Sequence, residues 1–545
     1  MQVINGLTRH SGDHQIFTIR IGRLFMSGMF DTKPDKAKRK LERTIKEEKA
    51  RKKTRKITII VTTIFMLLLC TALLLNSSWL RRTLPIMTID GVSFTTTEFE
   101  YYFNSQLIEY NNWASQIGWP MPDQNRPLSR QVYDSNTGET WADFIALSAY
   151  ARMQFLTGLY NDAVKNGFKL SDEQLDEIEA ELMMIDMQAE YTEGITSANM
   201  LLQRIYGNSM NVSIFRSILE FVATAEEYSI HIRDSFVYTD DELDEYYKDN
   251  AGDLDVLNYR ILMIAAEIPG EDTDDFETAM AQSIATAQSL AKDIESEITS
   301  EDDFIIAAYE YNTALYSDPD STIRELQGER LDELYSAWLL GSGRASGDTT
   351  VINTEQGASV LYFLSRDKND YNTVGMRQIL ILRENVNPSD FTMGVDDPEY
   401  LEALENAENE TRERAQNIES LFIAAGETEN ALIDLMEEHS DDSTEGGFYE
   451  GISRFQYQGA DFRAMRVVAE LEQWLFDGRA IGDWELIETS AYGFHLIYFT
   501  GYGEKFSHVV ARDRMRSAAH EDWLDSVEAD EPVKRTLLFN LLVNM

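Results

Sequence analysis

An internal repeat in the C-terminal half constrains the fold of this chain more than any other feature of its sequence. The landmark residues recur in the same order: Trp338 as Trp474, Asp348 as Asp483, Gly357 as Gly493 and, in the opening strands, Arg260 as Gln378. The first three pairs are offset by 136, 135 and 136 residues and the fourth by 118, so the second copy carries an insertion, which we place around residues 386–404. Each copy reads as a strand, helices, a Gly-Asp turn and two closing strands. This pattern predicts two tandem α+β domains with antiparallel sheets, over residues 254–368 and 373–502.

A run of 19 residues without a charge, 57–75, is the second constraint. At a rise of 1.5 Å per residue such a helix spans a hydrocarbon core of about 30 Å, and we expect an N-terminal transmembrane helix. Residues 33–56 before it contain 13 basic and 4 acidic side chains. By the positive-inside rule, residues 1–56 are a basic cytoplasmic leader and the C-terminal domains are extracytoplasmic. The expected location is the cell membrane, single-pass, whether translation starts at Met1 or Met29.

The composition excludes several classes of function. With 43 % hydrophobic residues and only 10 prolines, the chain of 545 residues is a folded protein. A net charge of −46 argues against nucleic-acid binding, because phosphate contacts need clustered Lys and Arg. The single cysteine, Cys70, excludes a disulfide framework and a cysteine-ligated metal site. We expect neither a metal nor a cofactor, since the sequence also lacks a phosphate-binding glycine loop and the His-Glu-x-x-His spacing.

Between the apolar run and the repeat, residues 84–253 have the pattern of a mainly helical module. Three capping boxes begin helices there: residues 95–98, 171–174 and 239–242. The C-terminal segment, residues 503–545, lies beyond the second repeat, and we expect it to pack back on this module. The aromatic and proline-rich stretch 110–127 fits either a packed loop or one wall of a peptide groove.

The order of these parts resembles the parvulin-type peptidyl-prolyl isomerases, in the arrangement of the SurA- and PrsA-like extracytoplasmic foldases. The likeness extends over about residues 84–540, and three motifs of the second copy carry it: Arg-Gln-Ile-Leu at 377–380, Ser-Asp-Asp leading to Gly-Gly at 440–447, and Gly-Phe-His at 493–495. The resemblance implies a helical chaperone module followed by two parvulin-like domains. It also implies action on unfolded or proline-containing exported polypeptides, without a cofactor.

The same resemblance assigns the site residues. His495 stands at one of the family's histidine positions and Asp442 at its acidic position, while Gln378 replaces the other histidine. In the first copy, Arg260 and Ser359 stand at the two histidine positions. We therefore expect the first copy to be catalytically silent.

The candidate catalytic residues are His495, Asp442 and Gln378, and the candidate substrate-binding residues are Leu471, Phe476 and Tyr449. An apolar pocket of this kind holds a proline ring and desolvates its amide, while polar groups beside it favour the twisted amide. Taken alone, His495 also fits a buried histidine bonded within its strand. Asp442 also fits a turn that caps local amides. Both interpretations stay open at this point.

The sequence supports one main function and two alternatives. The main hypothesis is a membrane-anchored folding factor that acts as a peptidyl-prolyl cis–trans isomerase through residues 373–502. The alternative is a non-catalytic holdase chaperone with a decayed isomerase site, and a third interpretation is a structural or sensory ectodomain. Residues 77–545 carry 88 acidic against 32 basic side chains, so we expect basic unfolded clients to associate faster than acidic ones. No motif identifies a client or an oligomeric state.

Overall fold

The computed structural model describes most of the chain, which divides into two compact units. The described residues are 33–75, 77–123, 125–270, 275–460, 462–527 and 533–543. Residues 1–32 of the expected leader, with both candidate start positions, lie outside them. The first unit comprises residues 1–149, 185–214 and 533–545, and the second comprises residues 150–184 and 215–532.

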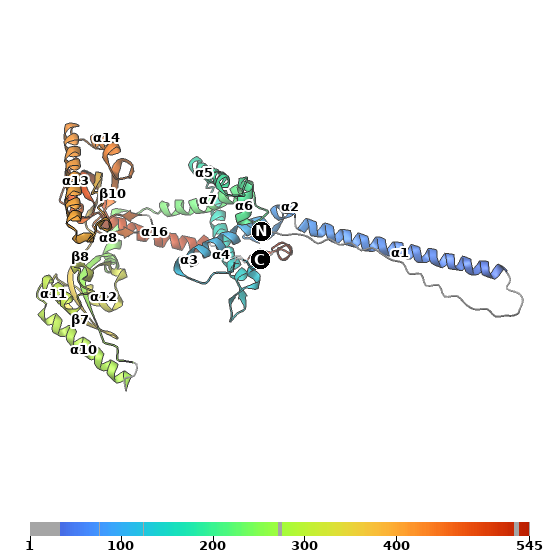
Figure 1. Cartoon of the computed structure of the whole chain (residues 1–545), viewed down its shortest axis with the longest axis horizontal. Coiled ribbons are helices and arrows are strands. Elements are labelled where there is room, and N and C mark those ends of the chain that lie inside the picture. The colour runs from blue at the N-terminus through green and yellow to red at the C-terminus, as the bar shows by residue number, and fades with distance from the viewer. Residues whose placement is uncertain are drawn as a thin grey trace. The chain divides into compact units, whose positions relative to one another are not determined.

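Residues 33–56 of the basic leader and the charge-free run belong to one helix. This helix, α1 (Lys33–Leu75), is 43 residues long (Figure 1). Within the described residues, no helix combines the length and the apolar character that crossing a membrane requires. The transmembrane helix expected over residues 57–75 is therefore not supported by the structure.

The first unit contains a small sheet with the strand order β15-β1-β2. The expected capping box is present, since Thr95 and Glu98 each bond the other's backbone N–H at the start of α3. The ring of Phe539 lies 5.6 Å from that of Phe99, so the end of the chain packs within this unit. The elements are α2 (Ser78–Thr83), β1 (Pro85–Ile89), β2 (Val92–Thr95), α3 (Thr96–Ile117), β3 (Val132–Asp134), β4 (Glu139–Thr140), α6 (Ala198–Tyr206), β15 (Lys534–Arg535) and α17 (Phe539–Leu542).

The second unit begins with helices and continues into the two repeats. The capping box of Thr239 and Glu242 starts α8, again as expected. Leu243 and Tyr247 of α8 share a core with Phe506 and Val510 of α16. The helices outside the repeats are α4 (Trp141–Lys165), α5 (Asp172–Tyr191) and α7 (Val212–Ser235), which belong in part to each unit, and α8 (Asp240–Asp249), α9 (Ala251–Leu254) and α16 (Phe506–Val527).

Each repeat is an antiparallel four-stranded sheet with helices, which confirms the α+β class. The sheet orders are β6-β5-β8-β7 and β10-β9-β14-β13, so the second sheet repeats the first position by position. The first repeat consists of β5 (Val256–Ala265), α10 (Phe276–Glu297), α11 (Glu301–Tyr311), β6 (Ile323–Gln327), α12 (Glu333–Leu339), β7 (Thr349–Thr354) and β8 (Gly357–Asp367). The second consists of β9 (Asn372–Leu382), α13 (Pro398–Ala424), α14 (Glu429–His439), β10 (Phe448–Ile452), β11 (Tyr457–Gln458), β12 (Arg463–Ala464), α15 (Ala469–Leu475), β13 (Trp484–Thr489) and β14 (Gly493–Lys505).

The strand register corrects the expected correspondence of the opening strands by one residue. Tyr362 pairs with Arg260 in the first sheet, and Tyr498 pairs with Arg377 in the second. The counterpart of Arg260 is therefore Arg377, at an offset of 117 rather than 118. Because side chains alternate along a strand, an alignment that is wrong by one residue matches each residue of the first strand with a residue on the opposite face of the second sheet.

The two arginines confirm this register through an equivalent ion pair. Arg260 Nε lies 2.7 Å from Glu301 Oε1, and Arg377 Nε lies 2.6 Å from Glu429 Oε1. Each glutamate is the first residue of the matching helix, α11 or α14. It follows that Arg260 does not occupy the position of Gln378, which Ile261 occupies instead.

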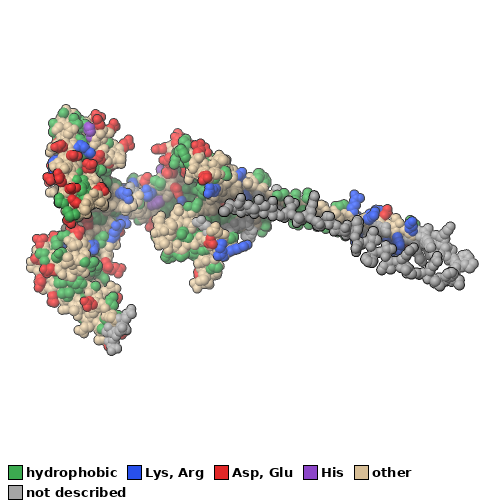
Figure 2. Space-filling view, viewed as in Figure 1, with side chains coloured by type: hydrophobic (Ala, Val, Ile, Leu, Met, Phe, Trp, Pro, Cys, Tyr) green, Lys and Arg blue, Asp and Glu red, His purple; other side chains and the backbone are tan. Residues whose placement is uncertain are grey.

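Both faces of the second sheet are covered, and the site lies on one of them. Ile379 and Leu496 face α13 and α14, where they pack with Phe422. Met376 and Ile497 face α15, where they pack with other buried apolar side chains. Since strand residues alternate, Gln378 lies on the same face as Met376, and His495 on the same face as Ile497. Figure 2 shows that acidic side chains are spread over the visible surface of both repeats.

Candidate functional site

A cavity of about 280 Å³ opens between the second sheet and α15. Five of the six site residues expected from the sequence line it. The lining residues are Met376, Gln378, Leu380, Asp442, Tyr449, Met465, Arg466, Val467, Val468, Leu471, Tyr492 and His495. The sheet supplies one wall, the segment before β10 supplies the acid, and the segment from β12 to α15 supplies the opposite wall.

The polar side of the cavity is a chain of hydrogen bonds that links Asp442 to His495 through Gln378. Gln378 Nε2 donates to Asp442 Oδ2 at 2.7 Å, and Gln378 Oε1 lies 2.9 Å from His495 Nδ1. At the far end, His495 Nε2 lies 3.1 Å from Thr489 Oγ1. Gln378 and His495 are both buried, at 6 % and 4 % exposure. Gln378 therefore has a defined role, as the bridge between the acid and the imidazole.

The charge on Asp442 sets the direction of every bond in this chain. An ionised carboxylate only accepts, so the amide of Gln378 must present its NH₂ group to Asp442 and its oxygen to His495. The imidazole then donates from Nδ1 to that oxygen. Its Nε2 is left as an acceptor that faces the Thr489 hydroxyl, whose proton is shared with the Gly493 carbonyl oxygen at 3.3 Å. His495 is thus held as the neutral Nδ1–H tautomer.

Two further donors hold the carboxylate in its charged form. The Tyr449 hydroxyl donates to Asp442 Oδ2 at 2.6 Å, and the Thr444 backbone N–H donates to Oδ1 at 3.0 Å. Burial raises the pKa of Asp442, but the hydrogen bonds from Tyr449, Thr444 and Gln378 outweigh it and leave the pKa below its usual value. Burial, with the bond to Asp442, raises the pKa of Tyr449, so this side chain stays a donor.

His495 is kept neutral by its surroundings. Burial lowers the pKa of His495 from 6.5 to about 4, although the charges of Asp442 and Glu470 act in the opposite direction. The imidazole is therefore uncharged at neutral pH. The site places the Asp442 carboxylate beside a neutral histidine, while Arg466, on the opposite wall, is paired with Glu325 and Glu472. This arrangement suits electrostatic stabilisation rather than proton transfer.

The apolar side of the cavity is formed by leucine and methionine side chains. Leu471 is buried at 2 % exposure at the base of α15, and Met376 is equally buried on β9. Met465, which follows β12, was missed by the sequence analysis because no periodic pattern marks it. Met376, in contrast, lies two residues before Gln378, and the alternation of a strand would have found it.

Phe476 is the one expected wall residue that lies elsewhere. Its ring contacts the Tyr371 ring at a centroid distance of 5.6 Å, and the Arg454 guanidinium lies 5.0 Å from its centre. Phe476, the residue that follows α15, does not line this cavity, and its expected role in substrate binding stays a prediction.

The first repeat has a cavity at the equivalent place, but it lacks a hydrogen-bonded series like that of Asp442, Gln378 and His495. There Ile261, Ser359 and Tyr335 stand where the second repeat has Gln378, His495 and Leu471. The Tyr335 hydroxyl lies 3.0 Å from Ser359 Oγ, and the two groups satisfy each other. This cavity, of about 770 Å³, has neither His nor Asp among its lining residues.

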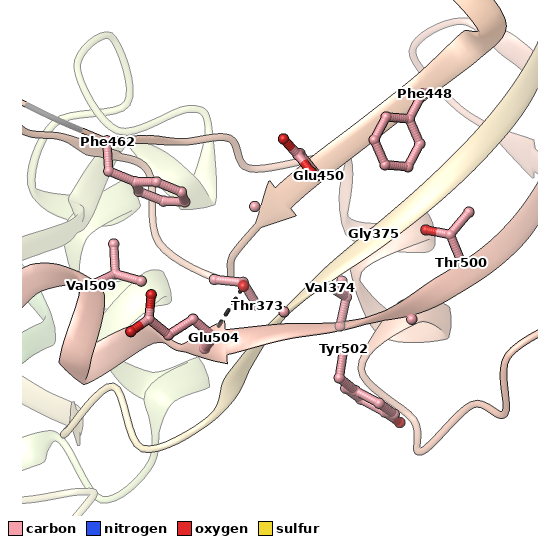
Figure 3. Close-up of a pocket in the computed structure, with 13 residues that line it drawn as sticks. Thr373, Val374, Gly375, Phe448, Glu450, Phe462, Thr500, Tyr502, Glu504 and Val509 are labelled. Atoms are coloured by element: carbon pink, nitrogen blue, oxygen red, sulfur yellow. Dashed lines mark hydrogen bonds between the residues drawn. The ribbon is translucent and has the colours of Figure 1, made fainter. Parts of the chain in front are cut away.

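A separate cavity of about 400 Å³ lies in the second repeat, at strands β9, β10 and β14 (Figure 3). Figure 3 shows Glu450 and Phe448 on its β10 side and Thr500 and Tyr502 on its β14 side. Neither His495 nor Asp442 lines it, so it is distinct from the candidate site. Within the described residues, no group of three or more His, Cys, Asp or Glu side chains is placed to hold a metal ion.

Comparison with known proteins adds little to this geometry. No family model matches the chain, and no curated protein matches it. Among solved structures, the crystal structure of PrsA from Bacillus subtilis is similar at 15 % sequence identity, with a TM-score of 0.15. The match covers 58 % of this chain and 96 % of that one. At this TM-score the likeness carries no argument about function, which is therefore argued from the site itself.

The depressed pKa of His495 predicts a pH-dependent stability. Between pH 6.5 and about 4 the unfolded chain binds a proton at this histidine that the folded chain does not. The free energy of unfolding therefore falls as the pH falls through this window, by at most about 3 kcal/mol from this one group. His495→Gln should flatten this slope in urea titrations of the full chain at pH 7, 5.5 and 4.5.

The matched control is His439→Gln, at the end of α14 and outside the cavity, which should leave the slope as it is. The low pKa of Asp442 acts below this window, because its stabilisation is present above pH 3.8 and is lost as the pH falls further. Equal slopes for the His495 variant and the unmodified chain would contradict a buried neutral imidazole.

Proposed function

We propose that this protein is a protein-folding factor with peptidyl-prolyl cis–trans isomerase activity of the parvulin type, located in residues 373–502. The observation that supports the proposal is the cavity in which an apolar pocket adjoins the chain Asp442–Gln378–His495. An X-Pro segment presents the same two features, an apolar ring and a polar amide. The proposed substrates are unfolded or proline-containing polypeptides.

The barrier to X-Pro rotation, about 18–20 kcal/mol, arises from the partial double bond of the amide. No bond has to be broken, so the protein needs only to favour the twisted amide over the planar one. In the proposed complex, the proline ring lies against Leu471, Met465 and Met376. Removing water from the amide weakens the charge-separated resonance form, since that form is stabilised by solvation.

The charge of the Asp442 carboxylate acts in the same direction. Resonance in the planar amide places negative charge on the carbonyl oxygen, and twisting removes it. A carbonyl oxygen beside the Asp442 carboxylate therefore destabilises the planar form more than the twisted one. A neutral His495 is consistent with this mechanism, because an imidazolium would cancel the field of the carboxylate.

We expect His495→Ala combined with Asp442→Ala to lower the isomerisation rate of the full chain at least tenfold, which corresponds to about 1.4 kcal/mol of barrier. The reason is that the double variant removes the fixed charge and the end of the hydrogen-bonded chain together. The rate is measured on a short proline-containing peptide, with circular dichroism as the check on folding.

Ser359→Ala is the matched control, since Ser359 is the counterpart of His495 in the first repeat. It should leave the isomerisation rate unchanged. Full activity in the double variant would rule out this site, and loss of activity in the control would point to the first repeat.

A second candidate function is supported by Gln378. An amide bridges acid and imidazole here, where the resembled family has a histidine, so a site that has lost its activity is consistent with a holdase chaperone that binds chains without isomerising them. Gln378→His separates the two. If the chain is an isomerase, the substitution lowers or preserves a clear rate, whereas a rise from a barely measurable rate identifies a decayed site and makes holding the main function.

We further propose that the folded units are extracytoplasmic and that residues 33–75 hold them at the cell membrane. The support is the sequence alone, with 13 basic residues before the 19-residue charge-free run. Protease added to intact cells should then degrade residues 77–545, because they lie outside. Protection of this region in intact cells, with cleavage after lysis, would contradict the location.

A further inference from the structure

A second apolar pocket, of about 600 Å³, lies in the first unit and has a charge opposite to that of the whole chain. It is formed by α3, the loop before β3, the end of α5 and α6. Figure 1 labels the three helices. We call it the arginine pocket. Its lining residues are Asn104, Leu107, Ile108, Asn111, Pro122, Arg126, Leu128, Gln188, Thr192, Leu201, Arg204 and Ile205.

Among the described residues, two arginines are the only charged ones that line the arginine pocket. Arg126 comes from the proline-rich loop and Arg204 from α6. Within the described part of the chain, neither guanidinium group forms an ion pair or a side-chain hydrogen bond. Both side chains are exposed, so their charges are accessible to a ligand, although the net charge of the whole chain is −46. Because both arginines line the same pocket, a carboxylate bound in it is attracted by both charges.

The rest of the lining is suited to a polypeptide rather than to a bare anion. Leu201 and Pro122 are buried and form apolar surface. Asn104 donates through Nδ2 to the carbonyl of Glu100, which leaves its Oδ1 as an acceptor. Amide side chains beside apolar surface can pair with the N–H and C=O groups of an extended chain. A volume of this size is typical of sites that bury a ligand of several residues or a small molecule.

We propose that the arginine pocket binds an apolar segment of an unfolded polypeptide through the carboxylate of an Asp or Glu side chain within that segment. The proposal rests on the proposed function, since it assumes that the chain binds unfolded polypeptides. Arginine suits this role, because its planar guanidinium binds a carboxylate with two parallel hydrogen bonds.

The arginine pocket divides client capture into two electrostatic steps. At long range the acidic chain repels acidic clients, and this repulsion weakens with salt over a Debye length of about 8 Å at physiological ionic strength. Inside the pocket, the arginines select a carboxylate at contact distance. The sequence stretch 110–127, which fitted either a loop or a groove wall, contributes Pro122 and Arg126 to this pocket.

The test measures binding of fluorescent capped peptides to the full chain. The peptides have leucine and phenylalanine around one central residue, which is glutamate, glutamine or lysine, and both termini are blocked. We expect the glutamate peptide to bind at least tenfold more tightly than the glutamine peptide. Arg126→Gln with Arg204→Gln should abolish this difference, while Arg130→Gln, an exposed arginine of the same loop that does not line the pocket, should preserve it.

A variant that reverses the charge of one arginine tests the proposal even if the double variant is unstable. Arg204→Glu should shift the preference from the glutamate peptide toward the lysine peptide. Equal binding of the glutamate and glutamine peptides, or a preference that survives in the double variant, would overturn the proposal. Binding of a glutamine peptide with a free C-terminus as tightly as the capped glutamate peptide would assign the pocket to chain ends and overturn the side-chain assignment.

The isomerisation rate, which tests the proposed isomerase function, is measured separately on the same samples. The double arginine variant should isomerise a short proline peptide at the rate of the unmodified chain. A chain without isomerase activity that still prefers the glutamate peptide contradicts the proposed enzymatic function alone. An active isomerase without the glutamate preference contradicts the arginine pocket alone.

Discussion

The charge on Asp442 is the constraint on which the candidate site depends. Three donors hold the carboxylate, and one of them, the Gln378 amide, passes its orientation on to His495. Removing the charge would leave the amide free to reverse, and the histidine would lose its tautomer. A neutral imidazole at 4 % exposure is stable here because every polar atom on it has a partner. The same arrangement places one negative charge beside an apolar cavity, which is the basis of the proposed mechanism.

The two repeats show which contacts belong to the scaffold and which to the site. The ion pairs Arg260–Glu301 and Arg377–Glu429 join the opening strand to the start of the same helix in both sheets. This ion pair is present in both repeats, although only the second has the hydrogen-bonded series Asp442–Gln378–His495. It therefore stabilises the fold and takes no part in the proposed chemistry. The difference between the repeats lies on the opposite face of the strand, where Ile261 replaces Gln378. The duplicated scaffold thus allowed one face to diverge.

Much of this fold could be predicted from the sequence, because Trp and Gly-Asp landmarks recur at nearly one offset. Gln378, Asp442 and His495 could also be brought together, although only the resemblance to a family connected them. The expected alignment was wrong by one residue at Arg260 because both opening strands are apolar around one arginine. The sequence alone does not show which face of the sheet a residue occupies. Phe476 and Met465 depend on how the segment around α15 turns, and no periodic pattern encodes that turn. The pairing of β15 with β1 joins residues far apart in the chain, and two-residue strands leave no signal.

The state of His495 tests this account most directly. Nitrogen NMR of the full chain with ¹⁵N-labelled histidine, assigned with His495→Gln, reports both the tautomer and the titration of the ring. The account predicts a neutral ring with the proton on Nδ1 at pH 7, and a pKa near 4. In Asp442→Asn the amide of Gln378 is no longer oriented by a charge, so the preference for Nδ1–H should weaken. A charged ring at pH 7, or a neutral ring with its proton on Nε2, would contradict the account.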